Sequence, residues 1–257
     1  MLGIVEGITE FLPISSTFHL IFVGKILGVP QNEFTSLFEV FIQSGAILSV
    51  VFLYFKDIIK DMELAKKALA SFIPTAIVGL VLHKIIKTVF FQSSWLMIAV
   101  FFIMAIVFFV VEYLIRSKKL KVEKNIAQVD YKMAVLIGLA QSLAVIPGVS
   151  RAGSVIVAMM FLGVRRDEAA KYSFILSIPT IFAASALDLF QMRHVVSSNM
   201  NNAGLLLIGF VVAFASSYGI VKWFIGYLQK HSLDTFGWYR IVAGIMVVTA
   251  MMFGLIR

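Results

Sequence analysis

The residues best able to do chemistry lie close together near the start of the chain. Two glutamates, three consecutive hydroxyl residues and a histidine fall between Glu6 and His19. Glu6 and Glu10 are four apart, so on a helix both carboxylates project from one face. Ionised groups are unfavourable at membrane depth, so this pair predicts a bound metal, a cationic partner or a shared proton. The alternative is a short interfacial helix with both glutamates in water.

The three hydroxyl residues, Ser15, Ser16 and Thr17, follow Pro13 where helical periodicity resumes, so they are expected to cap a helix. The same position offers free backbone N–H groups and the positive end of a helix dipole to an anion. A hydroxyl there could hold a phosphate oxygen or act as a nucleophile. His19 lies one helical turn after Ser16, where an imidazole could take a proton or attack directly. A purely structural histidine is the plain alternative.

A second break, at 146–151, contains Arg151. A buried guanidinium requires an anion, and its planar fork matches phosphate oxygens. Ser150 is expected to support that contact, and Gly148 lets the backbone approach a ligand closely. The alternative is an ion pair with one of the two glutamates that only holds the two breaks together.

The composition is that of a membrane protein. Of the 257 residues, 60% are hydrophobic and 14% are charged, whereas soluble domains are about 45–50% apolar and about 25% charged. The net charge of +8 is therefore assigned to a membrane surface and not to nucleic acid. Because the chain has no cysteine, thiolate chemistry is excluded and a metal would need oxygen or imidazole ligands.

Hydropathy predicts the elements that position these residues. Two apolar segments, 2–29 and 133–164, are broken near the middle by a Pro and a Ser cluster, and their halves are short enough to form re-entrant hairpins. The first carries two glutamates and no basic leader, so no cleavable signal peptide is expected. The fold class expected is an all-α polytopic membrane protein, a single domain over 1–257. Its six predicted transmembrane helices are 34–56, 68–90, 94–116, 171–190, 203–227 and 237–256.

Charge indicates the orientation and hydropathy indicates a repeat. If the predicted spans cross the membrane in turn, 16 of the 22 Lys and Arg lie on one side of it, and the positive-inside rule makes that side cytoplasmic. They fall in segments 56–67, 116–132, 165–171 and 222–240, with 4, 6, 3 and 3 basic residues. Lys84 and Lys87 lie on the other side.

A hairpin plus three spans occurs twice, which predicts inverted repeats over about 1–116 and 133–257, joined by the basic cytoplasmic loop 117–132.

These motifs resemble those of a known family. Residues 3–19 (GIVEGITEFLPISSTFH) and 147–153 (PGVSRAG) are similar to the two signature motifs of the undecaprenyl-diphosphate phosphatase family associated with bacitracin resistance. Residues 41–48 (FIQSGAIL) and 165–180 (RRDEAAKYSFILSIPT) agree as well. Phe18 stands where a Gly is usual in the family, and Ala152 where a Ser is usual.

The resemblance implies hydrolysis of undecaprenyl diphosphate at the outer face of the bacterial plasma membrane. This recycles the carrier lipid for peptidoglycan synthesis, with membrane lipids as the other partners. It implies Glu6, Glu10, Ser16, His19 and Arg151 as catalytic residues. Phosphate contacts are expected from Ser15, Thr17, Gly148, Ser150 and Arg151.

The resemblance also implies a divalent cation, Mg²⁺ or Ca²⁺, held by Glu6 and Glu10. Either Ser16 attacks with His19 as base, which is the favoured hypothesis, or His19 attacks directly. The alternative function is a polyprenyl-phosphate flippase or small-anion transporter, because broken helices in inverted repeats are typical of transporters. Phosphatase chemistry of the soluble acid-phosphatase type would need a further Arg/His motif. The oligomeric state stays open, with a homodimer among the alternatives.

Overall fold

The computed structural model describes residues 1–30, 32–85, 93–191 and 200–255. Within these ranges the chain is helical, and six helices are long and apolar enough to cross a membrane, which confirms the expected fold class. They are α3 (Glu33–Lys60), α4 (Met62–Ile85), α5 (Ser94–Arg116), α8 (Arg166–Gln191), α10 (Met200–Leu228) and α11 (Asp234–Met252). Their polar ends extend past the predicted spans, most clearly in α3 and α8, because a helix continues beyond the apolar stretch that crosses the lipid. The last residues of the predicted spans 68–90 and 237–256, as well as Lys87, lie outside the described residues.

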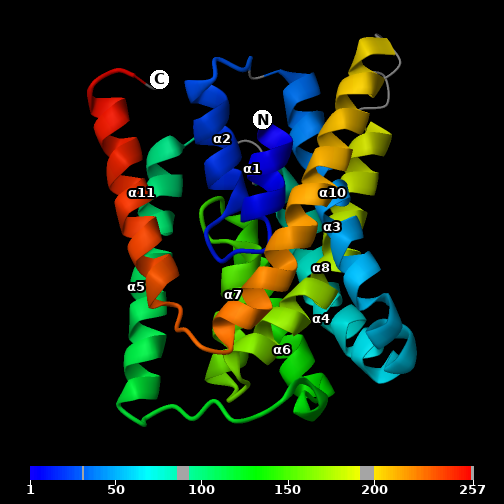
Figure 1. Ribbon diagram of the computed structural model, residues 1–257, viewed down its shortest axis with the longest axis vertical. Coiled ribbons are helices and arrows are strands. Elements are labelled where there is room, and N and C mark those ends of the chain that lie inside the picture. Colours follow the sequence, from blue (N-terminus) through cyan, green and yellow to red (C-terminus); the bar gives the residue numbers. More distant parts are fainter. Residues whose placement is uncertain (31, 86–92, 192–199, 256–257) are drawn as a thin grey trace.

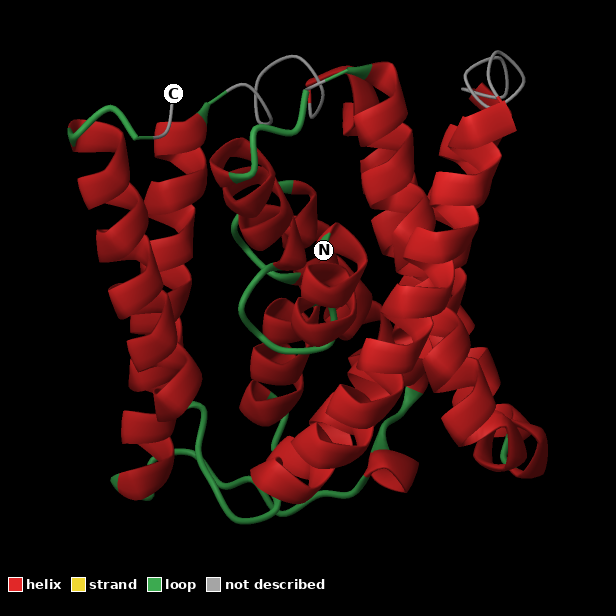
Figure 2. Cartoon of the chain, turned by 45° about the horizontal axis from the view of Figure 1, so that its top comes forward, coloured by secondary structure: helices red, strands yellow, loops and turns green. Residues whose placement is uncertain are grey.

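The two broken segments each form a pair of short helices. The first pair is α1 (Leu2–Thr9) and α2 (Ser16–Ile26), and the second is α6 (Tyr131–Ser142) and α7 (Arg151–Phe161), with the 3₁₀ turn η3 (Leu143–Val145) between them. These helices are shorter than the roughly 20 residues that a span needs. The connecting segments of both pairs meet near the middle of the bundle, whereas the other loops lie at its ends (Figures 1 and 2). The re-entrant path itself stays a prediction.

Glycines let the first helix of each pair approach a long helix closely. A Cβ on Gly7 of α1 would lie 2.5 Å from the Ala213 carbonyl oxygen of α10. A Cβ on Gly138 of α6 would lie 2.1 Å from the Ser71 carbonyl oxygen of α4. Thus α1 packs on the second long helix of the C-terminal half and α6 on the second long helix of the N-terminal half. This exchange is the arrangement that an inverted repeat predicts, although the repeat boundaries remain a prediction.

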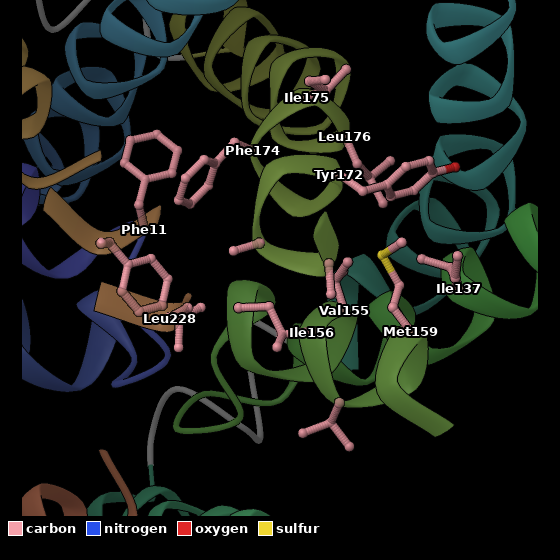
Figure 3. Packing of buried hydrophobic residues seen from close by; sticks show 14 of the residues in the cluster. Phe11, Ile137, Val155, Ile156, Met159, Tyr172, Phe174, Ile175, Leu176 and Leu228 are labelled. Atoms are coloured by element: carbon pink, nitrogen blue, oxygen red, sulfur yellow. The ribbon is translucent and has the colours of Figure 1, made fainter. Parts of the chain in front are cut away.

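An apolar core surrounds the breaks. Phe11, in the first break, meets Phe174 of α8 edge to face, with ring centroids 5.2 Å apart. The same cluster continues through Val155 and Ile156 of α7 to Tyr172 of α8 (Figure 3). Because these side chains are buried, the polar groups between them lie in a medium of low dielectric.

Ion pairs at the basic end of the bundle hold α5, α8 and α11 together. Glu112 of α5, only 1% exposed, binds the guanidinium of Arg166 of α8 through both carboxylate oxygens. The backbone N–H of Leu233, at the start of α11, donates to the same carboxylate at 2.9 Å. Arg116 of α5 pairs with Asp234 of α11. This network therefore joins the three helices at that end, and none of these four side chains lines the cavity between the breaks.

Candidate active site

The two breaks share one unusual backbone conformation. Ser15 has φ 67° and ψ 93°, and Ser150 has φ 68° and ψ 114°, which is the left-handed region that side chains other than glycine rarely adopt. Each serine is followed at once by an eleven-residue helix, α2 or α7. Strained serines at two equivalent positions mark backbone that the surrounding structure holds in place, as is common at functional sites.

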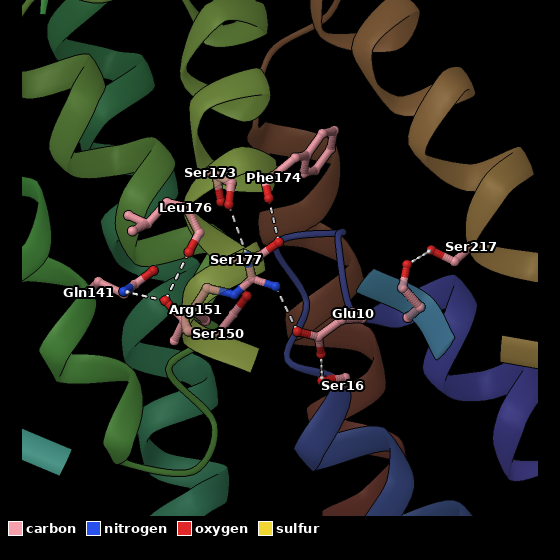
Figure 4. A network of polar contacts seen from close by, with 12 residues as sticks. Glu10, Ser16, Gln141, Ser150, Arg151, Ser173, Phe174, Leu176, Ser177 and Ser217 are labelled. Atoms are coloured by element: carbon pink, nitrogen blue, oxygen red, sulfur yellow. Dashed lines mark hydrogen bonds and ion pairs between the residues drawn. The ribbon is translucent and has the colours of Figure 1, made fainter. Parts of the chain in front are cut away.

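A chain of charge-assisted contacts joins the breaks. The Ser16 hydroxyl donates to Glu10 Oε2 at 2.5 Å, and Arg151 Nη2 donates to Glu10 Oε1 at 2.7 Å (Figure 4). Arg151 Nη1 also donates to the Ser173 carbonyl oxygen of α8 at 3.0 Å. The Glu10 and Arg151 side chains are 7% and 11% exposed. Glu10 therefore bridges a hydroxyl of the first break and a guanidinium of the second, and the ion pair with a glutamate that was the alternative interpretation of Arg151 is present.

A cavity of about 210 Å³ lies between the breaks. The predicted site residues that line it are Glu10, Ser15, Ser16, Thr17, Gly148, Ser150 and Arg151. The first N–H groups of any helix lack helical partners, so both α2 and α7 present donors and a positive dipole end at this cavity. The Nε of Arg151 is buried and has no partner among the described residues, so a donor is left for a ligand.

A polar wall of the cavity was absent from the sequence-based prediction. Gln141 of α6, fully buried, donates from Nε2 to the hydroxyls of Thr75 of α4 and Thr180 of α8, at 2.9 and 3.2 Å. All three line the cavity together with Gln43 of α3. The repeated Ile-Pro-Thr sequence at 73–75 and 178–180 is the signal that could have identified the two threonines.

Glu6 lies behind Glu10 and does not line the cavity. It is 0% exposed, and neither of its carboxylate oxygens has a hydrogen-bond partner among the described residues. A buried carboxylate without a donor needs a proton or a cation. Two adjacent carboxylates plus substrate oxygens are a donor set that Mg²⁺ uses, so Glu6 and Glu10 fit a divalent ion. No group of three His, Asp or Glu side chains that could hold a metal occurs in the described part of the chain.

His19 lies apart from the Ser16–Glu10–Arg151 chain. Its Nδ1 is 2.8 Å from the Ser15 carbonyl oxygen and its Nε2 is 2.7 Å from the Tyr239 hydroxyl of α11. Because a carbonyl oxygen only accepts, Nδ1 carries a proton. His19 lines a second, largely apolar cavity of about 340 Å³ between α2 and α11, not the cavity at Ser16. The geometry therefore pairs Ser16 with Glu10, and not with His19 as the favoured sequence hypothesis had it.

Phe18 also lines the second cavity. Its ring stacks on Phe101 of α5, with centroids 3.8 Å apart and planes within 4°. The family's usual Gly has no side chain to make this contact, so in this chain Phe18 anchors the start of α2 against α5.

Arg240 was misplaced by the sequence analysis. It was counted among the basic residues of segment 222–240 at the cytoplasmic side, but it is 0% exposed inside α11 and contacts both breaks. A charged residue within an apolar span is itself a functional signal, and that signal could have identified it.

Comparison with known proteins shows the family that the chain resembles over nearly its whole length. A family model described as "Bacitracin resistance protein BacA" matches residues 1–246. An "Undecaprenyl-diphosphatase" of Aquifex aeolicus is 44% identical over 255 residues, covering 98% of this chain and 97% of that relative. Relatives with the same name from a Sulfurihydrogenibium species and from Campylobacter fetus are 44% and 42% identical. They cover 96% and 95% of this chain, and 95% and 94% of their own lengths.

Proposed function

The chain belongs to the bacitracin resistance protein BacA family, and from this premise we propose that it hydrolyses undecaprenyl diphosphate to undecaprenyl phosphate and inorganic phosphate. The names of its relatives favour an enzyme over the transport alternative. The observation that carries a mechanism is the contact of the Ser16 hydroxyl with Glu10, which is in turn paired with Arg151.

In the first step, Ser16 Oγ attacks the terminal phosphorus of the diphosphate. Its proton passes to Glu10 Oε2, which already accepts the Ser16 hydrogen bond. The bond from that phosphorus to the bridging oxygen breaks, and undecaprenyl phosphate leaves with the electron pair. A phosphoserine remains at Ser16.

In the second step, water attacks the phosphoserine. Glu10, which carries the proton taken from Ser16 in the first step, returns it to the Ser16 oxygen as the bond from that oxygen to phosphorus breaks. The proton of the attacking water leaves with the inorganic phosphate, so Ser16 regains its hydroxyl and Glu10 its carboxylate. Inorganic phosphate is the second product, and the atoms of one water molecule are consumed in each cycle. The apolar core around the breaks limits access of bulk water to this step.

Arg151 and the starts of α2 and α7 hold the phosphate oxygens in this mechanism. Phosphoryl transfer depends mainly on positioning and on neutralising the equatorial oxygens. Arg151 keeps its buried Nε–H free for this purpose while its other nitrogens bind Glu10 and Ser173. Ser15, Thr17, Ser150 and Gly148 line the same cavity and supply hydroxyl or backbone contacts to the second phosphate.

His19 is assigned a positioning role at the start of α2. Its Nδ1–H donates to the Ser15 carbonyl oxygen, and Ser15 is the strained residue that precedes Ser16. The ring is held from the other side by Tyr239. His19 therefore orients the peptide that sets the direction of Ser16.

A divalent cation, Mg²⁺ or Ca²⁺, would be held by Glu6 with Glu10. When bound, it would neutralise charge on the phosphate oxygens. Glu6 suits this role because both of its oxygens are buried without partners.

The site is proposed to face the outside of the plasma membrane. The turns that follow α3, α5, α7 and α10 lie toward one end of the bundle, and three of these four carry clustered basic residues (Figure 1). The positive-inside rule places that end in the cytoplasm. The first hairpin enters from the opposite end, so substrate would reach Ser16 from outside.

The test is phosphate release from undecaprenyl diphosphate by the purified protein in detergent. It would be measured with Mg²⁺, with Ca²⁺ and with EDTA, for wild type, Ser16→Ala and His19→Ala. Cation-dependent release that Ser16→Ala abolishes and His19→Ala weakens is expected. A folded wild type that releases no phosphate under any of these conditions would refute the proposed activity.

A further inference from the structure

Arg240 is the largest fully buried side chain described in this protein. Its Nε donates to the Pro13 carbonyl oxygen of the first break at 2.9 Å. Its Nη1 and Nη2 donate to the Gly148 and Val149 carbonyl oxygens of the second break at 2.9 and 3.3 Å. One side chain of α11 thus contacts the backbone of both breaks, within two residues of Ser15 and Ser150.

The charge of Arg240 has no carboxylate partner among the described residues. The largely buried side chains of Arg151 and Arg166, 11% and 22% exposed, each pair with a glutamate. Arg240 instead lies over the rings of Phe101 and Phe108, at 4.6 and 5.3 Å from their centroids, and makes a longer contact with the Phe101 carbonyl oxygen at 3.4 Å. Carbonyl and ring dipoles satisfy its donors but leave a net positive charge, which is unfavourable in a buried site unless an anion arrives.

We propose that Arg240 is a positioning residue of the diphosphate site, which rests on the proposed function. It fixes the two breaks at the spacing that lets the starts of α2 and α7 bind one diphosphate, and its positive charge favours the bound anion. The Val149 carbonyl that it contacts belongs to the same peptide group as the Ser150 N–H at the start of α7. A donor on that carbonyl polarises the N–H and strengthens its bond to an anion.

Holding both breaks at once needs a guanidinium, whereas the favourable charge alone would be kept by a lysine. Only a planar fork reaches carbonyl oxygens on two separate segments at once, whereas a lysine ammonium offers a single point charge. The residue before it, Tyr239, contacts His19, so consecutive residues of α11 hold both the imidazole and the breaks. Arg240 does not itself need to touch the substrate.

The test compares Arg240→Met and Arg240→Lys with a matched control, Arg166→Met. The control removes a guanidinium of the same size from a largely buried contact at the start of α8, which holds the basic end of the bundle. For each variant, kcat and KM for undecaprenyl diphosphate are measured per folded molecule, and Tm is followed by tryptophan fluorescence. Binding of a non-hydrolysable undecaprenyl methylenediphosphonate gives affinity independently of turnover.

For Arg240→Met we expect kcat to fall by about 100-fold or more, as when an oxyanion donor is lost, and the diphosphonate to bind about tenfold more weakly. Arg240→Lys, which keeps the charge, should recover about tenfold of kcat. Arg166→Met should lower Tm but keep kcat within about threefold. If Arg240→Met lowers kcat no more than Arg166→Met, or if Lys restores nothing over Met, Arg240 is merely structural and the proposal is wrong.

A wild type without phosphatase activity would refute the proposed function, not this inference. In that case the affinities of the same variants for the diphosphonate test whether Arg240 helps to hold a diphosphate. A tenfold loss in Arg240→Met that Arg240→Lys partly restores would still support the role of Arg240 in holding a diphosphate, and unchanged affinity would overturn it.

Discussion

Glu10→Gln tests whether Glu10 and Ser16 act as one catalytic unit. The change keeps the shape of the side chain and an oxygen for the Ser16 hydrogen bond, but the amide cannot accept a proton. General-base catalysis contributes about 10²–10⁴-fold, so kcat should fall by about that factor, equivalent to about 3–5 kcal/mol. Separately, the free energy of unfolding should fall by about 1–3 kcal/mol, because the Arg151 guanidinium loses its charged partner at 2.7 Å.

The decisive comparison is with Ser16→Ala and with the double variant. If Ser16 attacks and Glu10 takes its proton, removing either group disables the same step, so the double variant loses no more than the worse single variant. With single losses of about 10³-fold, a shared step predicts about 10³-fold for the pair, whereas independent roles predict about 10⁶-fold.

The assay is rapid-quench turnover with substrate labelled at the terminal phosphate. Wild type should accumulate label on Ser16, Glu10→Gln should do so slowly, and Ser16→Ala should show none. Ser49→Ala is the control, because Ser49 is fully buried and bonded to Ser217 but lies outside the cavity. Multiplicative losses in the double variant, or label on His19, would refute the assignment of Glu10 as the base.

Three further changes give simpler tests. Arg166→Met should lower the free energy of unfolding by about 3–5 kcal/mol, because it leaves Glu112 buried and unpaired; thermal melts in detergent would measure it, and a Tm unchanged from wild type would contradict it. Gly138→Ala should lower the free energy of unfolding by about 1–3 kcal/mol, because the added methyl group clashes with α4. Gly219→Ala is the control, since its methyl group would meet no atom within 4 Å. Equal Tm values for the two variants would contradict the close approach of α6 to α4. Glu6→Gln should raise the Mg²⁺ concentration needed for half-maximal activity by about tenfold, measured by titration after EDTA treatment; an unchanged titration would exclude Glu6 as a ligand.

Much of the fold followed from the sequence because lipid imposes a length requirement. A span needs about 20 apolar residues, so counting gave the six long helices and exposed 2–29 and 133–164 as exceptions. The breaks were located by Pro13 and Pro147, since proline lacks the N–H that a helix interior needs. For Arg151, the rule that a buried guanidinium needs an anion left two alternatives, a phosphate or one of the glutamates, and the structure shows the pair with Glu10.

The details of the site did not follow, because spacing along a helix does not give the direction of a side chain. Ser16 and His19 are one turn apart, yet Ser16 turns to Glu10 and the His19 ring turns to Tyr239, which is 220 residues away in sequence. The position of the Tyr239 ring depends on how α11 packs beside α2, and no local pattern encodes it. Arg240 was missed for a different reason: it was counted as a loop charge from its place near a span end.

The balance of buried charge explains why the site should need a cation. Around the breaks, Glu6 and Glu10 carry two negative charges when ionised, and Arg151 and Arg240 carry two positive charges. Glu39 is a third carboxyl group close enough to act on Glu6, so these carboxylates can already balance both arginines, and a diphosphate adds two or more negative charges to the cavity. Either a carboxyl group must take up a proton or a divalent cation must enter with the substrate. Glu10 accepts hydrogen bonds from Arg151 and Ser16, whereas Glu6 has no donor among the described residues. We therefore expect this compensation to occur at Glu6.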